Sequence, residues 1–481
     1  YRFYINGIEN EYHFGELARL FLDDGEFEVI PVTAFPGMAA LLGRDSRVLN
    51  EDGSLSRESI KRQLYGILEE ITGTTQPWGT LTGVRPLKLA FQVYDQEKSK
   101  GISTGECLRE TRRRMGGEYL LSPEKLDLLM DILSYQLENV APPDPATDSL
   151  YVGIPFCPTR CSYCAFASNV ASQDDIERYL GDLLKEIDFM GDIYSRQHRR
   201  LESVYIGGGT PTTLDPEQLT RLIEAIYSSF DITPGSIEFT VEAGRPDTIT
   251  KEKITALRDL MVDRISINPQ TMKDHTLELM GRSHDAEQIR EAFRITEGSG
   301  FTTVNSDLIA GLPEENVSDF TESLRQVIAL GAENITVHTL SVKHGSRLRA
   351  QDPDYYRKRG DVAGEMLREG GRILCSAGYR PYYIYRQKHQ MGGLENVGWC
   401  RPGHHSLYNI RIMEEKQTVI ALGAGAIGKV YYPERDGLER IANVSNYRIY
   451  SERFPEILRR KNEYFGTASD PEWDRLEESW H

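Results

Sequence analysis

Three cysteines lie within eight residues of the sequence, at Cys157, Cys161 and Cys164. Thiolates are ligands for iron and zinc. At spacings of four and three residues on one loop, three thiolates can bind three corners of a cubane [4Fe–4S] cluster. The fourth iron then has no protein ligand and is open to a substrate or a cofactor. The spacing therefore predicts an iron–sulfur cluster with one reactive position.

Two other kinds of metal site, a structural zinc site and a ferredoxin-type cluster, also use closely spaced cysteines. A structural zinc ion needs a fourth Cys or His, usually in a second pair, and a ferredoxin cluster needs a fourth cysteine. The clustering of three cysteines favours metal or redox chemistry over a disulfide framework. The other three of the six cysteines are scattered singly, at Cys107, Cys375 and Cys400.

A second group of possible ligands lies in the segment WCRPGHH, which contains Cys400, His404 and His405. Thiolate and imidazole side chains this close together could bind heme or a metal ion. No supporting pattern accompanies them, so an ordinary loop is the alternative interpretation.

Short apolar segments typical of strands alternate with amphipathic helical patterns in the middle of the chain. This alternation predicts βα units around a parallel sheet with right-handed crossovers. Six such units predict an α/β fold, a partial (β/α)6 TIM-like barrel. The predicted strands are 149–156, 203–210, 236–244, 264–270, 302–313 and 334–342.

The residues that could do chemistry fall at or just past the carboxyl ends of these predicted strands. They are the three cysteines, the glycine run at 207–209, Glu242, Gln270 and Asp307. In βα barrels the functional site is built at that end. The sequence therefore predicts that these residues share one site.

The stretch APPDPATDS (141–149) is rich in proline, lacks apolar periodicity and is typical of a linker. Before it we expect a hairpin around Asn6-Gly7 and capped amphipathic helices over 56–73 and 122–140. The predicted parts are an N-terminal α+β accessory domain at 1–140, a linker at 141–148, the barrel core at 149–345 and a mostly helical C-terminal cap at 346–481.

Composition limits the function classes. The 481 residues suffice for two or three domains, and 56 basic against 73 acidic residues give a net charge of −17, which would repel nucleic acid. No apolar run approaches the roughly 20 residues that a membrane span needs. No secretion signal is visible in the first residues, so we expect a cytoplasmic protein.

The CxxxCxxC spacing is the signature of the radical-SAM superfamily. The blocks YVGIPFCPTRCSYC, YIGGGTPTTL, FTVEAGRPDTI, RISINPQTM, NSDLIAGLP and LGAGAIG resemble oxygen-independent coproporphyrinogen III oxidases and their relatives, which include heme chaperones. The segment WGTLTGVRPLK (78–88) resembles the HemZ-type coproporphyrinogen dehydrogenases. The resemblance implies that S-adenosylmethionine binds the open iron and that one electron from the reduced cluster, supplied by a donor such as flavodoxin or ferredoxin, splits it to a 5′-deoxyadenosyl radical.

The resemblance also implies the cofactor ligands. Cys157, Cys161 and Cys164 would bind the cluster. Residues expected around the first S-adenosylmethionine are Tyr151, Tyr163, Gly208, Gly209, Thr210 and Glu242. A second set, associated in the family with a second molecule of S-adenosylmethionine, is Gln270, Arg282, Asp307, Ser341 and Ile427.

The reaction implied is the oxidative decarboxylation of two propionates of coproporphyrinogen III to vinyl groups, which gives protoporphyrinogen IX without oxygen in heme biosynthesis. The tetrapyrrole substrate carries four carboxylates, so its pocket should offer cations beside an apolar wall. The segment YRPYYIYRQKHQ has this mixture, although alternating aromatic residues are also typical of a plain strand. Its candidate residues are Tyr379, Tyr382, Tyr383, Tyr385, Arg386 and Lys388.

One position departs from the best-known oxidases. They carry a fourth cysteine two residues after the third, where this sequence has Phe166, as the heme chaperones do. That thiol is not a cluster ligand, so cluster binding is unaffected. A heme-binding chaperone, and a radical-SAM methyltransferase or heme-degrading relative, are therefore alternatives to the oxidase. The N-terminal WGTLTGVRP segment and the set of Gln270, Arg282 and Asp307 favour the oxidase.

Overall fold

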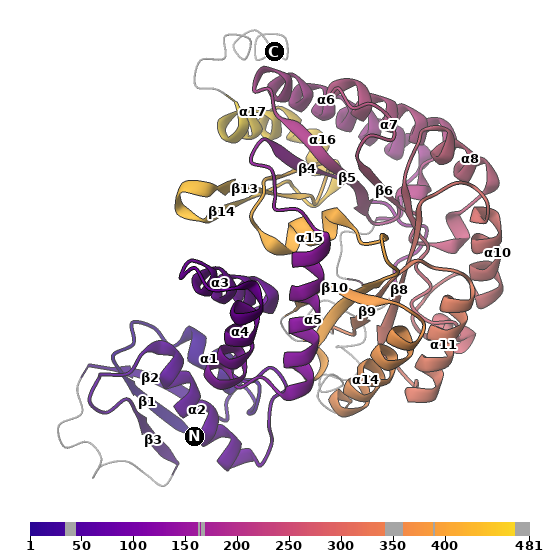
Figure 1. Ribbon diagram of the computed structural model, residues 1–481. Helices are drawn as coiled ribbons and strands as arrows, with labels where there is room; N and C mark the ends of the chain where they lie inside the picture. Colours follow the sequence, from indigo (N-terminus) through magenta and orange to yellow (C-terminus); the bar gives the residue numbers. More distant parts are fainter. Residues whose placement is uncertain (34–44, 162–163, 165–168, 342–358, 388–389, 467–481) are drawn as a thin grey trace. The chain divides into compact units, whose positions relative to one another are not determined.

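The computed structural model describes residues 1–33, 45–161, 164, 169–341, 359–387 and 390–466 (Figure 1). The chain divides into two compact units between Glu138 and Asn139, beside the predicted linker. The second unit runs from there to the C-terminus, except that residues 384–395 group with the N-terminal unit. No helix among the described residues is long and apolar enough to cross a membrane.

The N-terminal unit contains a three-stranded sheet in the order β2-β1-β3, with both strand pairs parallel. The predicted hairpin around Asn6-Gly7 is wrong. Gly7 has a φ of +76° and does turn the chain, but the next segment is a helix because Phe14 and Leu17 bury one of its faces. The elements are β1 (Arg2–Asn6), α1 (Tyr12–Ala18), β2 (Glu28–Val32) and β3 (Ser46–Leu49).

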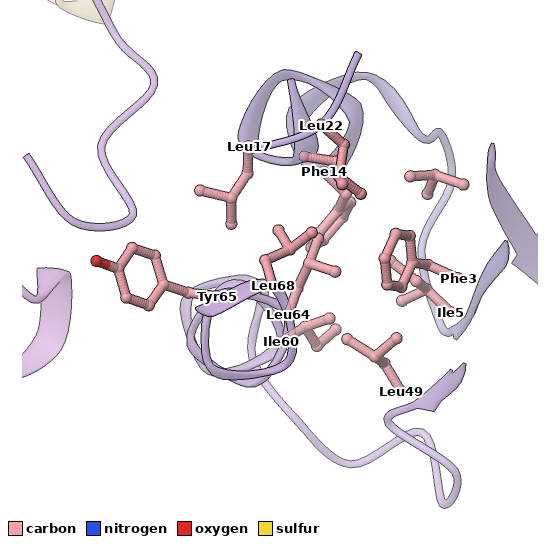
Figure 2. Close-up of a cluster of buried hydrophobic side chains, with 12 residues drawn as sticks. Phe3, Ile5, Phe14, Leu17, Leu22, Leu49, Ile60, Leu64, Tyr65 and Leu68 are labelled. Carbon is pink, nitrogen blue, oxygen red and sulfur yellow. The ribbon is translucent and has the colours of Figure 1, made fainter. Parts of the chain in front are cut away.

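Four longer helices complete this unit. Both helices predicted here are present, and the first is closed by the Ser56 side chain at its start and by Gly73, with a φ of +67°, at its end. Figure 2 shows Leu64 and Leu68 of this helix packed with Phe3 and other apolar side chains. The helices are α2 (Arg57–Thr72), α3 (Pro86–Lys98), α4 (Thr104–Tyr119) and α5 (Pro123–Asn139).

Two buried charges explain why residues 384–395 belong to the N-terminal unit. Glu395 is paired with Lys125 at 2.7 Å and accepts a hydrogen bond from the Trp78 indole at 2.8 Å. Arg386 lies 5.5 Å from the centre of the Trp78 ring and donates to the carbonyl of Gly393 at 2.7 Å. Groups buried in this way need such partners.

The second unit contains the predicted partial barrel. Six strands pair in parallel and in chain order, and helices follow them along the outside of the sheet (Figure 1). The strands are β4 (Thr147–Ile154), β5 (Arg200–Gly208), β6 (Glu238–Glu242), β7 (Arg264–Ser266), β8 (Thr303–Ala310) and β9 (Asn334–Thr339). The helices are α6 (Gln173–Arg196), α7 (Pro216–Ser229), α8 (Lys251–Asp259), α9 (Asp274–Leu279), α10 (Ala286–Thr296) and α11 (Val317–Ala329).

The C-terminal segment has helices but also extends the sheet at both edges. On one side β12 pairs in parallel with β4 and is followed by β13 and β14, and on the other side β11 pairs antiparallel with β9. Short aromatic and β-branched runs form these strands. The elements are α14 (Gly360–Ser376), β10 (Arg380–Arg386), β11 (Glu395–Cys400), α15 (Leu407–Glu414), β12 (Val419–Leu422), β13 (Ile427–Tyr432), β14 (Gly437–Ala442), α16 (Tyr447–Glu452) and α17 (Phe454–Phe465).

The segment around WCRPGHH closes the amino-terminal end of the barrel strands. Arg264, the first residue of β7, donates to the carbonyls of His404 and His405, each at 3.1 Å. Glu238, the first residue of β6, accepts from the first backbone N–H groups of α15, at 2.7 Å from Leu407. Trp399 and Cys400 thus end strand β11, and residues 401–406 form a structural loop at the end opposite to the candidate site.

Candidate functional site

The cysteine loop begins at the carboxyl end of β4. The backbone N–H of Cys157 donates to the carbonyl of Asn169 at 3.0 Å, and the N–H of Asn169 donates to the carbonyl of Pro155 at 2.9 Å. These two bonds hold Asn169 beside residues 155–157. The N–H of Cys164 donates to the carbonyl of Cys161 at 3.3 Å. Strand β4 thus presents all three cysteines on one closed loop.

Polar donors lie against two of the three sulfurs. The Thr210 hydroxyl donates to Cys157 Sγ at 3.5 Å, and Arg245 Nη1 donates to Cys161 Sγ at 3.8 Å. Burial raises the pKa of the Cys157 thiol, and the bond from Thr210 acts in the opposite direction. Donors of this kind stabilise thiolate sulfur, so the surroundings fit a cluster bound through thiolates.

The described residues contain no group of three or more His, Cys, Asp or Glu side chains arranged as a metal-ion site. Ligation of a cluster by Cys157, Cys161 and Cys164 therefore stays a prediction. Tyr163 and Phe166 lie outside the described residues.

The glycine-rich turn after β5 packs against the start of the cysteine loop. Gly208 has a φ of +114°, which side chains rarely tolerate. A Cβ on Gly209 would lie 2.4 Å from the carbonyl oxygen of Phe156 and 3.0 Å from Cys157 Sγ. The N–H of Thr210 donates to that same carbonyl at 2.7 Å. The turn therefore needs glycine so that its backbone can contact the cysteine loop, and the same close approach would serve a bound ligand.

Gly209→Ala should lower the free energy of unfolding by about 1–3 kcal/mol, because the new methyl overlaps backbone that cannot move freely. It should also reduce the iron retained after reconstitution, since Cys157 would be displaced. Thermal or urea unfolding and iron analysis measure the two effects. Gly181→Ala on α6 is the matched control, because no atom lies within 4 Å of its new Cβ. Equal behaviour of the two variants would contradict this account.

Glu242 is the last residue of β6 and faces a column of tyrosines. Tyr205 donates a short hydrogen bond to its carboxylate, and the Tyr205 ring lies 4.6 Å from that of Tyr408 and 6.2 Å from that of Tyr151. Loss of hydration raises the pKa of Glu242 to about 7, and the charge of Asp307 adds to this while the Tyr205 bond opposes it. A carboxyl group that titrates near neutral pH inside a barrel is a good candidate for ligand binding.

The predicted second set gathers on the neighbouring strands. The backbone N–H of Gln270 donates to the carbonyl of Asp307 at 2.9 Å, and Gln270 has a φ of +69°. Asn305 Nδ2 donates to Asp307 Oδ1 at 3.1 Å, and His338 Nε2 lies 3.6 Å from Asp307 Oδ2. Burial alone would raise the pKa of Asp307, but His338 and Asn305 outweigh it and lower that pKa. Asp307 is thus held as a carboxylate.

Arg282 reaches the same end of the barrel from the loop after α9. Its Nη1 donates to the carbonyls of Asn268 at 3.0 Å and Gly244 at 3.5 Å. These carbonyls follow β7 and β6, so Arg282 links the ends of two barrel strands. The structure therefore brings Arg282, Gln270 and Asp307 to one region, as predicted from the sequence.

Several polar atoms around this region are buried and have no hydrogen-bond partner among the described residues. They lie on four successive strands or just beyond them, and buried polar atoms without partners are rare unless a ligand or water binds them. Asn305 precedes Asp307 by two residues and Thr240 precedes Glu242 by two, so each pair shares one face of its strand. The atoms are Thr240 Oγ1, Asn268 Oδ1, Asn305 Oδ1 and Ser341 Oγ.

Two predicted groups are placed differently. Ile427 is 50% exposed at the start of β13. Residues 380–386 of the aromatic segment form β10, in which the Tyr382 hydroxyl accepts from Asn334 at 3.1 Å and the Tyr383 hydroxyl lies 3.3 Å from that of Thr336. Arg386 donates to the backbone carbonyl of Gly393, so the segment forms the strand that its alternation predicts, and its part in a substrate pocket stays a prediction. Lys388 lies outside the described residues.

Four residues of the site were not predicted from the sequence: Tyr205, Arg245, His338 and Tyr408. Tyr205 could have been found, because it occupies in VYIGGG the place of Tyr151 in LYVGIP, and the two are paired in the β4–β5 register. Arg245 follows Glu242 by three residues, which is a weak signal. Tyr408 lies in a helix whose start is bound by Glu238, and its backbone N–H donates to the Glu238 carboxylate. The two residues are 170 positions apart in the sequence, so no spacing predicts their contact.

The chain is similar in sequence to known proteins of one superfamily. Residues 151–327 match the Radical SAM superfamily. The oxygen-independent coproporphyrinogen-III oxidase-like protein HemZ of Bacillus subtilis (strain 168) is 37% identical over 413 residues, which are 85% of this chain and 81% of that protein. The heme chaperone HemW of the same organism is 33% identical over 314 residues, 64% of this chain and 76% of HemW.

Among solved structures, the coproporphyrinogen III oxidase HemN of Escherichia coli, described as a radical SAM enzyme, matches 70% of this chain and 82% of that chain, with a TM-score of 0.46 and 21% identity. A [4Fe–4S] cluster and S-adenosylmethionine are the cofactors of the superfamily. With a HemZ relative matched over most of both sequences, the chain belongs to the radical SAM superfamily and, within it, to the family of the HemZ-type oxygen-independent coproporphyrinogen III oxidase-like proteins.

Proposed function

We propose that this protein converts coproporphyrinogen III to protoporphyrinogen IX by oxygen-independent oxidative decarboxylation. The observation that carries the proposal is the 37% identity to a coproporphyrinogen-III oxidase-like protein over 85% of the chain, a length that extends beyond the barrel unit into part of the N-terminal unit. The polar barrel end formed by Glu242, Asp307 and Arg282 supports it, because a radical enzyme must bind a charged cofactor away from water.

In this proposal the chain's residues have distinct roles. Cys157, Cys161 and Cys164 hold the cluster, and Gly208 and Gly209 let the backbone of their turn approach it closely. When bound, the cluster and S-adenosylmethionine supply a radical that takes a hydrogen atom from a propionate side chain. The substrate then loses one electron to an acceptor and releases carbon dioxide, which leaves a vinyl group.

The carboxylates orient the cofactor. Glu242 accepts hydrogen bonds from the first S-adenosylmethionine, while Tyr205 holds the Glu242 side chain in place. Asp307, fixed by Asn305 and His338, accepts from a second molecule of S-adenosylmethionine. Two molecules would suit two successive hydrogen abstractions.

An anaerobic assay tests the proposal. The reconstituted protein is incubated with dithionite or reduced flavodoxin, S-adenosylmethionine and coproporphyrinogen III, and the products are separated by chromatography. We expect 5′-deoxyadenosine together with the mono- and didecarboxylated porphyrinogens. Formation of 5′-deoxyadenosine without any decarboxylated product would overturn the oxidase assignment.

A heme-binding chaperone is the second candidate, because HemW of Bacillus subtilis is 33% identical over 64% of this chain and the sequence has Phe166 where the best-known oxidases have a fourth cysteine. Titration with heme separates the two functions. A saturable change in the heme spectrum, combined with no turnover of coproporphyrinogen III, would support the chaperone.

A further inference from the structure

Arg245 connects the end of β6 to the cysteine loop. Its side chain is only 4% exposed. Nη2 donates to Thr159 Oγ1 at 3.0 Å, and Nη1 donates to the Thr159 carbonyl at 3.4 Å and to Cys161 Sγ at 3.8 Å. A single guanidinium therefore holds both the backbone and a sulfur of the loop between the first two cysteines.

The guanidinium is itself fixed from the opposite side. Asp247 accepts from Arg245 Nε and Nη2, both at 3.0 Å, in a bidentate pair. Ser283 donates to Asp247 Oδ2 at 2.6 Å, and His284 Nδ1 lies 3.5 Å from Asp247 Oδ1. Burial alone would raise the pKa of Asp247, but the interactions with His284, Ser283 and Arg245 outweigh it and lower that pKa strongly. The carboxylate is thus ionised and holds Arg245 in one orientation.

A buried arginine that needed only a partner for its charge would be satisfied by Asp247. Arg264, at the other end of the barrel, shows the ordinary case, since its Nη1 and Nη2 atoms donate to carbonyl and hydroxyl oxygens. Arg245 also donates to such oxygens, at Thr159, but in addition it directs a donor at a cysteine sulfur. Its planar fork reaches Asp247, Thr159 and Cys161 together, which a lysine could not do.

We propose that Arg245 is a positioning residue for the iron–sulfur cluster, which clamps the cysteine loop at Thr159 and places a fixed positive charge beside the Cys161 thiolate. The proposal rests on cluster binding by Cys157, Cys161 and Cys164 under the proposed function, but not on the identity of the substrate. Hydrogen bonds and charge near cluster sulfurs set the reduction potential. The reduced cluster carries one more negative charge than the oxidised cluster, so a nearby cation stabilises it. Arg245 therefore raises the reduction potential and slows loss of iron.

The test uses the full-length reconstituted protein without S-adenosylmethionine or substrate. Redox titration followed by electron paramagnetic resonance gives the midpoint potential of the cluster, and release of iron to a chelator gives its retention. In Arg245→Gln we expect a more negative midpoint potential and iron release at least several-fold faster. In Arg245→Lys the potential should stay closer to that of the wild type, because the charge remains, while iron release should still be faster.

Two further variants keep the outcome interpretable. Thr159→Val removes one loop contact without touching the buried ion pair, and it should speed iron release with little change in potential. Arg264→Gln removes a buried arginine at the opposite end of the barrel strands and should leave the potential unchanged. If Arg245→Gln fails to fold, Thr159→Val and Arg245→Lys still decide the matter.

An intact cluster whose potential and iron release are the same in wild type, Arg245→Gln, Arg245→Lys and Thr159→Val would overturn the inference. It would leave the proposed function standing. Conversely, the midpoint potential could be shifted in the Arg245 variants of a protein that does not turn over coproporphyrinogen III. That result would support the role of Arg245 and would contradict only the proposed substrate.

Discussion

Cys161→Ala is expected to leave the reconstituted protein without a stable [4Fe–4S] cluster and to reduce cleavage of S-adenosylmethionine to background. The three thiolates are the only protein ligands expected for the cluster, so loss of one leaves a second iron unprotected. The same variant also removes the sulfur to which Arg245 donates. Iron and sulfide analysis, the visible absorption spectrum and the yield of 5′-deoxyadenosine measure the effect.

Cys375→Ala is the matched control, because Cys375 is an exposed cysteine on α14 outside the CxxxCxxC loop. It should retain the iron content and the cleavage activity of the wild type. A Cys161→Ala protein that still held four irons per chain and cleaved S-adenosylmethionine would refute the assignment of the three cysteines.

Glu242→Gln is expected to weaken binding of S-adenosylmethionine by about 10- to 100-fold, as for the loss of a hydrogen bond to a charged group. The amide retains the size of the side chain but removes the carboxylate that Tyr205 holds. Equilibrium dialysis or calorimetry on the cluster-loaded protein gives the affinity. Glu252→Gln, an exposed residue in the first turn of α8, should bind with wild-type affinity.

The raised pKa of Glu242, about 7, gives this prediction a pH dependence. S-adenosylmethionine is a cation at its sulfonium, so the ionised carboxylate binds it better, and affinity should fall as the pH drops through about 7. Folding responds in the opposite direction. In the unfolded chain the Glu242 carboxyl group has the ordinary glutamate pKa of 4.5, whereas in the folded protein its pKa is about 7. The stability that this carboxyl group contributes is therefore present below pH 4.5 and is lost as the pH rises from 4.5 to about 7. Glu242→Gln should remove the contribution of this carboxyl group to both dependences. An unchanged pH profile in that variant would show that another group titrates.

The sequence allowed prediction of those parts of the fold that repeat a local pattern. The barrel followed from the alternation of short apolar runs and amphipathic helices, and the site followed from the position of Glu242, Gln270 and Asp307 after those runs. Both inferences use rules that act over a few residues or over one βα unit. The confirmed helix at α2 is likewise marked in the sequence by Ser56 and Gly73.

The features that were missed depend on contacts between distant segments. An Asn-Gly pair was interpreted as a hairpin, although the next strand joins β1 in parallel only after a helix has intervened. Arg386 resembled a substrate ligand because nothing in its neighbourhood shows that it donates to backbone carbonyls. Tyr408 lies in the tyrosine column, and the helix that carries it is bound at its start by Glu238. Such partners are far away in sequence, and no local periodicity marks them.

The pairing of β4 with β12 has a consequence for biosynthesis. Ser149 in β4 donates to the Gln417 side chain beside β12, a partner 268 residues further along the chain. A ribosome that adds about 5–20 residues per second needs on the order of 10–60 s to cover that distance. During this interval β4 lacks one of its neighbouring strands, and the loop that follows it already carries all three thiols. The sheet beside the cysteine loop is therefore completed only late in synthesis, when β12 has been made and can pair with β4.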